Sequence, residues 1–418
     1  MEERILKYKR SVKTYIAVWF MLMCSGTVIF NIKYNSLYIP IFVLYAFYYA
    51  FSLNNYKLSM DKRKLVIFLS ILGIVLLNSV YHISDGVAYN GVAQKILYLV
   101  GTFLCCCTMT ISEYKKTYEN IVFVLCIIAI VLQILCILDY ISYSWVDING
   151  RLFPMGWGHC LSWRSGNFRR LSGMYIEPGM FQIIINYAFV FLIDDISEGQ
   201  RKKGKKYEAI FAFVYILSVV LTLSTTGYFV LALLVVKYFF KLNQVAHSKV
   251  LKAFTILGIS FFAFAAIEVF AFSELISSKF SQDSASFLAR KNDILSGLKI
   301  IFNKPIWGYG YGTEGRNAIF DSMGISNISS GIISDSINFG LPLFLFMVAF
   351  VIDTTRKQKW KVGEFLIIIL FFIQNMTEAC LFFPIMQVFL FGFNKRQSLC
   401  SQFNITIQGG KEYASNKN

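Results

Sequence analysis

The sequence predicts an all-α, polytopic membrane protein with about twelve membrane-spanning helices, and three observations support this prediction. Hydrophobic residues make up 56% of the 418-residue chain and charged residues only 15%, whereas soluble domains have roughly 25% charged residues. Apolar runs close to the ~20 residues that cross a bilayer recur along the whole chain. The runs are continuous rather than alternating, so they predict helices and not the strands of a membrane barrel.

The basic residues between the apolar runs give these spans an orientation. With the N-terminus inside, 28 of the 40 Lys and Arg residues lie in inside segments and 12 in outside segments. Cytoplasmic loops are enriched in Lys and Arg, so this alternation favours cytoplasmic N- and C-termini. The expected spans are 15–31, 37–53, 65–82, 96–112, 120–138, 178–193, 208–223, 227–240, 253–272, 332–352, 363–377 and 380–393.

The predicted spans and their orientation describe a single integral membrane domain over 1–418. It has two long outside loops at 139–177 and 273–331 and a cytoplasmic tail at 394–418. The inside connections are too short to hold a nucleotide-binding domain. A net charge of +16 would suit a nucleic acid, but the basic residues stand in short clusters between apolar runs, as the positive-inside rule produces. We therefore expect chemistry on the outer face and no nucleic-acid partner.

The first long outside loop is rich in Trp, Tyr and Phe and contains Arg151, Arg164, Arg169 and Arg170. One interpretation is an interfacial aromatic belt with arginines that reach the lipid headgroups. The other is a site for a sugar bound to phosphate, because aromatic rings stack on sugar rings and guanidinium groups bind phosphate in a bidentate manner. All four basic residues are Arg and none is Lys, which favours phosphate.

Glu177 stands before Pro178 at the start of an apolar run, in the stretch RRLSGMYIEPGMF. Proline is favoured in the first turn of a helix, and the residue before it is pushed toward an extended conformation. We therefore expect Glu177 at a helix N-terminus. It is either a capping acid that interacts with the helix dipole, or a base or a partner that orients Arg170.

The second long outside loop predicts an amphipathic helix followed by a glycine-rich turn. Apolar residues recur with helical spacing between 288 and 302, while Arg290 and Asp293 lie off that face, as in a helix on a membrane surface. In the next stretch, NKPIWGYGYG, glycines let the backbone approach a ligand closely. The stretch lacks the strand–turn–helix context of a dinucleotide site. The candidate substrate-binding residues here are Trp307, Gly308, Gly310 and Gly312.

Four acids lie near the predicted outer ends of spans, namely Asp139, Glu268, Asp335 and Glu378. Ionisable groups at such positions are candidate functional residues, and they fit equally well as interfacial residues in water. The three histidines have no partner at metal-ligand spacing, so we expect neither a metal nor a cofactor. Eight of the nine cysteines lie in apolar runs or in the tail, which does not indicate a disulfide framework.

Three stretches resemble signatures of the bacterial O-antigen polymerases and ligases. RRLSGMYIEPGMF resembles their Arg-x-x-Gly…Pro signature, and RKNDILSGLKIIFNKPIWGYGYG resembles their second one, with an Arg, an amphipathic helix, a Pro and Gly-x-Gly-x-Gly. STTGYFVLALLVV at 224–236 resembles their Ser/Thr-Gly junction between two closely spaced spans. The resemblance covers about 165–352 in motifs and the whole chain in topology.

The resemblance implies polymerisation of oligosaccharide repeats carried on undecaprenyl pyrophosphate, by glycosyl transfer at the outer face of the bacterial cytoplasmic membrane. It implies that Arg170 and Arg290 bind the pyrophosphate or stabilise its departure, without a metal or a nucleotide. Arg164, Arg169 and Asp293 are candidate substrate-binding residues of the same loops. The implied partners are the carrier lipid, a chain-length regulator and a flippase, and the implied product is O-antigen, capsule or exopolysaccharide.

Ligases of this family often have a His-Asn pair before the span that follows the glycine loop, whereas this chain has NISSGIISDSINFG. The departure favours a polymerase over a ligase and leaves the general base open between Glu177 and Asp335. A flippase or another transporter is the alternative from a different class. Such a protein is expected to have charged or Gly/Pro-broken spans at the membrane midplane, whereas here the polar residues gather outside.

Overall fold

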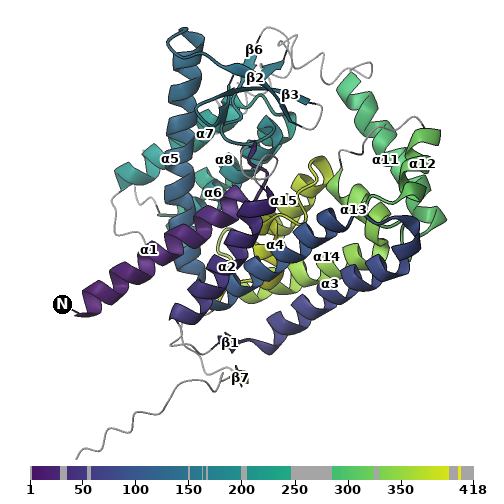
Figure 1. The fold of residues 1–418 in the computed structure, drawn as a ribbon. Helices are drawn as coiled ribbons and strands as arrows, with labels where there is room; N and C mark the ends of the chain where they lie inside the picture. The colour runs from purple at the N-terminus through teal and green to yellow at the C-terminus, as the bar shows by residue number, and fades with distance from the viewer. Residues whose placement is uncertain are drawn as a thin grey trace, which may run out of the picture.

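The computed structural model describes residues 2–28, 35–53, 58–148, 151–161, 163–165, 168–198, 205–245, 285–323, 328, 330–394 and 403–405. Within these ranges the protein is mostly helical (Figure 1), which confirms the predicted helical class. The expected span at 253–272, with Glu268, and most of the tail lie outside the described residues.

Most of the other predicted spans correspond to helices. These are α1 (Glu2–Met23), α2 (Asn35–Leu53), α3 (Lys62–Tyr81), α4 (Tyr89–Thr108), α5 (Ile111–Ile137), α6 (Pro178–Glu198), α7 (Lys205–Leu221), α8 (Thr225–Val245), α14 (Leu341–Gln358), α15 (Glu364–Thr377) and α16 (Pro384–Phe391). Among the described residues, four of them, α3 to α6, are long and apolar enough to cross a membrane. The chain is consistent with a multi-pass membrane protein, and the expected count of about twelve spans is not confirmed.

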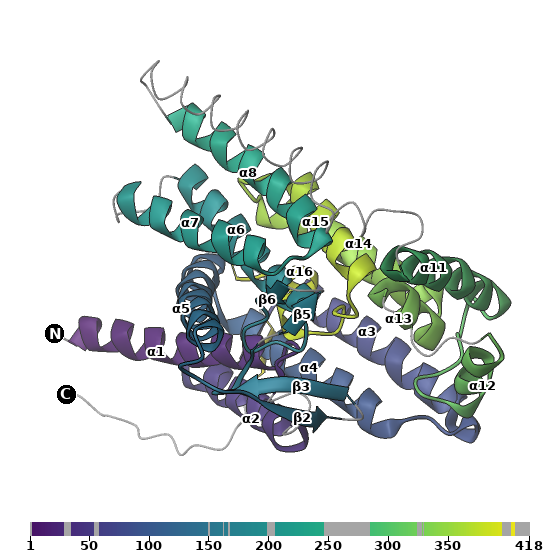
Figure 2. The ribbon, with the colours of Figure 1, turned by 90° about the horizontal axis from the view of Figure 1, so that it is seen from above.

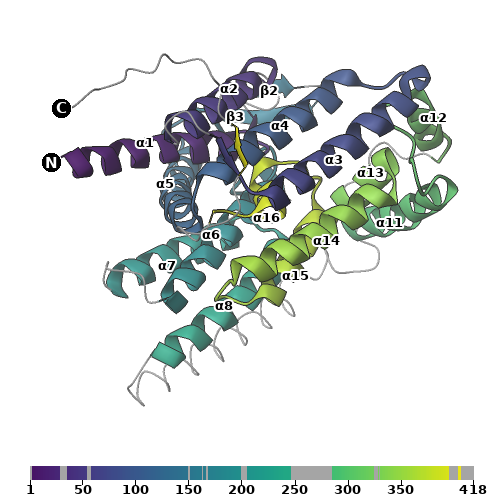
Figure 3. The same cartoon turned by 90° about the horizontal axis from the view of Figure 1, so that it is seen from below.

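Helix α6 lies inside the bundle, where it packs against α5, α7 and α8 (Figure 2). In the most apolar 18-residue stretch of this helix, 94% is buried inside the protein. Its amide side chains are bonded within the protein: Gln182 donates to Gln374 of α15 at 2.9 Å, and Asn186 donates to Gln182 at 2.7 Å. A buried polar group without a partner costs about 1–3 kcal/mol, so the bond from Gln182 fixes α6 against α15, whereas the bond from Asn186 lies within α6. Figure 3 shows α3 between α4 and α14, with which it is in contact.

The predicted first outside loop contains short strands, which corrects the all-α prediction for this part of the chain. The strands are β2 (Ser144–Ile148), β3 (Arg151–Gly156), β4 (His159–Cys160), β5 (Trp163–Ser165) and β6 (Phe168–Arg170). β2, β3 and β4 form an antiparallel sheet in that order, and β5 pairs with β6. The physical reason is that the aromatic residues of this loop favour a pleated, half-buried surface. One further pair joins β1 (Leu58–Met60) to β7 (Phe403–Ile405).

The predicted second outside loop contains α11 (Ala285–Asn303) and α12 (Glu314–Ser322), with the glycine-rich turn between them. The predicted helix is therefore present, but its predicted apolar face is not buried as a whole, since Leu295 and Leu298 are 52% and 38% exposed. Its residues Ile300 and Ile301 are buried in a separate apolar cluster with Ile333 of α13 (Gly331–Phe339), whereas Phe302 is 70% exposed. One face of α11 thus covers α13, and Figure 1 shows α11 and α12 together at one side of the protein.

The predicted span at 332–352 consists of two helices. Gly340 has a φ of +83° and separates α13 from α14. A Cβ at this position would overlap the backbone oxygen of Ile306, and glycine adopts a positive φ at little steric cost. The break ends α13 beside the glycine-rich turn and leaves Asp335 in the middle of this short helix. The break therefore determines the position of Asp335 relative to the glycine-rich turn.

Candidate functional site

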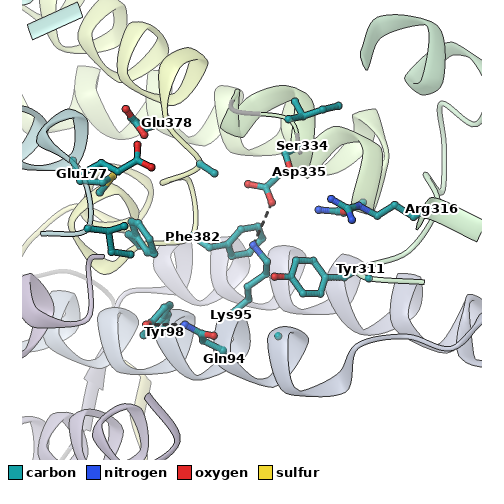
Figure 4. A pocket seen from close by; sticks show the side chains of 18 residues that line it. Gln94, Lys95, Tyr98, Glu177, Tyr311, Arg316, Ser334, Asp335, Glu378 and Phe382 are labelled. Atoms are coloured by element: carbon teal, nitrogen blue, oxygen red, sulfur yellow. Dashed lines mark hydrogen bonds and ion pairs between the residues drawn. The ribbon is translucent and has the colours of Figure 1, made fainter. Parts of the chain in front are cut away.

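A cavity of about 670 Å³ lies between α4, the start of α6, α13 and the segment that follows α15. It brings together side chains that are far apart in the sequence, among them Lys95, Glu177, Arg316, Asp335 and Glu378. Figure 4 shows Glu177 and Glu378 at one end, Arg316 at the other, and Lys95 with Asp335 between them. Three acidic and two basic side chains thus line one cavity of the size that small-molecule sites usually have, roughly 300–1,000 Å³.

Lys95 of α4 is held by an ion pair and by aromatic rings. Its Nζ atom lies 3.2 Å from Oδ1 of Asp335. The same atom is 4.1 Å from the ring centre of Phe382 and 5.1 Å from that of Tyr311. A cation over an aromatic face gains about 0.5–2 kcal/mol. With its side chain only 16% exposed, Lys95 is a fixed positive charge inside the cavity.

Arg316 of α12 brings a second positive charge into the cavity. Its guanidinium stacks on Phe320, with Cζ 4.3 Å from the ring centre, and points toward Asp335 in Figure 4. Burial lowers the pKa of Arg316, while Tyr311 and Asp335 raise it; an arginine nevertheless stays protonated at neutral pH. Its buried Nε has no hydrogen-bond acceptor among the residues that the structure describes. This donor is therefore available to an anionic ligand.

Glu177 directly precedes α6, as the sequence predicts. Its backbone oxygen accepts from the N–H groups of Met180 at 3.0 Å and Phe181 at 3.3 Å. The carboxylates of Glu177 and Glu378 lie side by side in Figure 4. Gly179 leaves room for this arrangement, because a Cβ there would overlap Oε1 of Glu378. The start of a helix attracts negative charge, so the dipole of α6 favours both carboxylates at this end of the cavity.

Uncharged hydrogen-bonding groups line the rest of the cavity. On α4, Gln94 donates to the hydroxyl of Tyr98 at 3.0 Å, and both residues line the cavity. Ser334 and Asn338 line it from α13, and Met180 is among the apolar lining residues. Amide, hydroxyl and aromatic groups in this mixture match a sugar ring, which has several hydroxyls to orient and two faces that stack.

The predicted glycine-rich turn contributes Gly312 to the lining of the cavity. The φ of this residue is +68°, in the region that favours glycine. Gly308 and Gly310 are not among the lining residues. The N–H of Gly310 donates instead to the carbonyl of Asn338 at 3.0 Å, and a Cβ on Gly308 would overlap the carbonyl oxygen of Ile337. These two glycines therefore let the turn pack against α13.

Trp307 also lies outside the lining of the cavity. Its ring stacks on Tyr81 at the end of α3, with 5.1 Å between the ring centres. Its backbone oxygen accepts a hydrogen bond from Asn78 of the same helix. Trp307 thus fixes the turn to α3, and its effect on the cavity is to position the following segment, which carries Tyr311 and Arg316.

The predicted arginines of the first outside loop take part in backbone contacts. Arg169 donates from Nη1 to the carbonyl of Cys136 at 3.0 Å, and Arg170 donates from Nε to the carbonyl of Thr222 at 2.9 Å. These bonds hold β6 to the ends of α5 and α7, and neither arginine lines the cavity. The side chains of Arg164, Arg290 and Asp293 lie outside the described residues. The expected pairing of Arg170 with Arg290 stays a prediction.

Of the residues proposed from the sequence, Glu177, Asp335, Glu378 and Gly312 are brought together in the cavity. Lys95 and Arg316 were not among the proposed site residues because no motif surrounds either of them. For Lys95 a signal exists: it is one of only two basic residues in the predicted short outside loops, where the positive-inside rule disfavours them. For Arg316 we find no comparable signal in the sequence.

No protein-family model matches the chain, and no curated protein matches it. Fold and composition therefore define only a class, a mostly helical protein with several helices able to cross a membrane. Within the described part of the chain, no group of three or more His, Cys, Asp or Glu side chains is placed to hold a metal ion.

Proposed function

We propose that this protein polymerises oligosaccharide repeat units carried on undecaprenyl pyrophosphate, at the outer face of the bacterial cytoplasmic membrane. The observation that carries the proposal is the cavity, which joins a pair of carboxylates to two fixed cations through a neutral, hydrogen-bonding lining. A flippase that delivers the repeats and a chain-length regulator belong to the same proposal as partners. The product is a surface polysaccharide such as O-antigen or capsule.

The cations suit the donor, whose leaving group is a diphosphate. Lys95 is fixed by Asp335 and Phe382, and Arg316 is fixed on Phe320 with a buried Nε that has no acceptor among the described residues. Charges held in place before the reaction stabilise a developing anion without reorganisation, and removing one such donor typically costs about 10²–10³ in rate. Lys95 and Arg316 would therefore stabilise the departing diphosphate, and the reaction needs no nucleotide.

The carboxylates suit the acceptor. We assign the base to Glu177, which lines the cavity at the start of α6 with its carboxylate beside that of Glu378. In the proposed step an acceptor hydroxyl gives its proton to Glu177, and its oxygen bonds to the anomeric carbon of the donor. The bond from that carbon to the diphosphate oxygen breaks, and the diphosphate leaves with the electron pair. General bases of this kind contribute about 10²–10⁴ in rate.

Deletion of the protein in its host tests the proposal against the two alternatives. A surface lipid that carries a single repeat unit supports a polymerase. A surface without any repeat indicates a flippase or another transporter, and polymer that accumulates on the carrier indicates a ligase. Either of the last two results would overturn the proposal.

Complementation then tests the site. Glu177→Gln should leave the single-repeat phenotype, whereas Glu314→Gln should restore polymer. Glu314 is the matched control because it is an exposed acid on α12 that does not line the cavity. Polymer of normal length with Glu177→Gln at normal protein level would exclude Glu177 as the base.

A further inference from the structure

The cavity has its own anion between its two cations. Asp335 pairs with Lys95 at 3.2 Å, and the two side chains are only 9% and 16% exposed. In Figure 4 the guanidinium of Arg316 points toward the same carboxylate. Asp335 therefore occupies the position in which an anionic ligand would meet both cations.

The ion pair is not the only contact that holds Lys95 in place. The rings of Phe382, Tyr311 and Phe339 surround the ammonium group at 4.1, 5.1 and 5.8 Å from their centres. Aromatic cages of this kind hold cations by themselves. The rings would therefore keep Lys95 near its place if Asp335 moved away, while Asp335 neutralises one of the two cations until a ligand displaces it.

Displacement depends on the charge of the ligand. An anion that binds at Lys95 must replace the attraction of Asp335. It must also tolerate the repulsion of this carboxylate, which remains nearby. A group with a single phosphate brings little advantage over Asp335 itself. A diphosphate has two phosphoryl groups, so it can contact Lys95 and Arg316 together and offset the lost ion pair.

We propose that Asp335 is a displaceable counter-ion that makes the cavity selective for diphosphates over single phosphates. The choice of a diphosphate rests on the proposed function, while the competition between Asp335 and an anion for Lys95 does not. The consequence for a membrane enzyme is that free phosphate and the headgroups of monophosphate lipids do not occupy the site. Only a ligand with two linked phosphates opens the Lys95–Asp335 pair.

Binding to the purified full-length protein in detergent tests this inference. The probes are inorganic phosphate, inorganic pyrophosphate and farnesyl diphosphate, each titrated by calorimetry. The wild type should bind both diphosphates at least about tenfold more tightly than phosphate. Asp335→Asn should bind phosphate about tenfold or more tightly than the wild type does, so that the selectivity falls. Lys95→Met should lose all three ligands.

Asp321→Asn is the matched control, since Asp321 is an exposed acid on α12. It should bind the three probes as the wild type does. Asp335→Ser provides a second neutral substitution if the Asn variant does not fold.

Unchanged or weaker phosphate binding in the folded neutral variant would overturn the inference, and so would a wild type that binds no pyrophosphate. Tighter binding of farnesyl diphosphate than of pyrophosphate identifies a lipid-linked ligand, and equal binding identifies the diphosphate alone as the recognised group. The deletion phenotype tests the proposed polymerase function, whereas the titrations test the role of Asp335. A phenotype other than the single-repeat one would overturn the function and leave the binding results valid, so failure of one proposal can be told from failure of the other.

Discussion

Replacing Lys95 by Met should destabilise the protein mainly through the carboxylate that it leaves behind. The side chains of Lys95 and Asp335 are 16% and 9% exposed, so the pair is close to buried. Removing one partner of a buried ion pair costs about 3–5 kcal/mol, and partial exposure reduces this figure. The lost cation–aromatic contact with Phe382 is partly replaced by a sulfur–aromatic contact from Met. We expect a loss of about 2–4 kcal/mol in unfolding free energy.

The double variant Lys95→Met/Asp335→Asn separates this explanation from simple loss of packing. It should recover most of the lost stability, because no buried charge remains unpaired, and yet it should make no polymer. The assay is unfolding of the purified protein in detergent, followed by tryptophan fluorescence, together with the chain length of the surface polysaccharide. Lys299→Met, at an exposed position of α11, is the control. Strictly additive losses from the two single substitutions would refute the reasoning, since coupled residues show interaction energies of about 0.5–3 kcal/mol.

Three further substitutions test other parts of the site. Arg316→Lys keeps the charge but loses the planar guanidinium and its stacking, so polymer formation should fall by about tenfold or more at normal protein level; wild-type chain length would contradict this. Gly179→Ala should displace the carboxylate of Glu378 and lower activity, while Gly315→Ala, where a Cβ meets open space, should not; equal activities would exclude the role given to Gly179. Gly308→Ala forces a Cβ onto a φ of +61° and onto a backbone carbonyl of α13, so it should lower the unfolding temperature by several degrees, and an unchanged value would show that the turn adjusts freely.

The sequence was a good guide to helices and to single residues at helix ends. Continuous apolar runs predicted most of the described helices because their period and length are local properties. Glu177 was predicted at a helix start from the proline that follows it, and it directly precedes α6. Asp335 was selected as an ionisable group near the outer end of a span, and it lines the cavity. Both inferences needed only neighbouring residues.

The sequence could not show which residues meet across the fold. Lys95 and Asp335 are 240 positions apart, and no local pattern in either segment points to the other. The same holds for the glycine-rich turn. Glycine readily adopts a positive φ, but no local pattern shows that Gly308 packs against α13. Arg169 and Arg170 were interpreted as phosphate ligands because arginine suits phosphate, yet both donate to backbone carbonyls that only the tertiary structure brings near.

The hydrogen bond between Gln182 and Gln374 has a consequence for biosynthesis. The two amides are separated by 192 positions, and a ribosome adds about 5–20 residues per second, so α6 is synthesised roughly 10–40 s before its partner on α15 exists. During this interval a largely buried helix carries the amide of Gln182, whose final acceptor has not been synthesised. We expect arrested chains of increasing length to be sensitive to membrane proteases until α15 is complete, which pulse labelling would show as a step in lifetime at that length. A gradual rise in lifetime with chain length would instead mean that α6 finds temporary partners of its own.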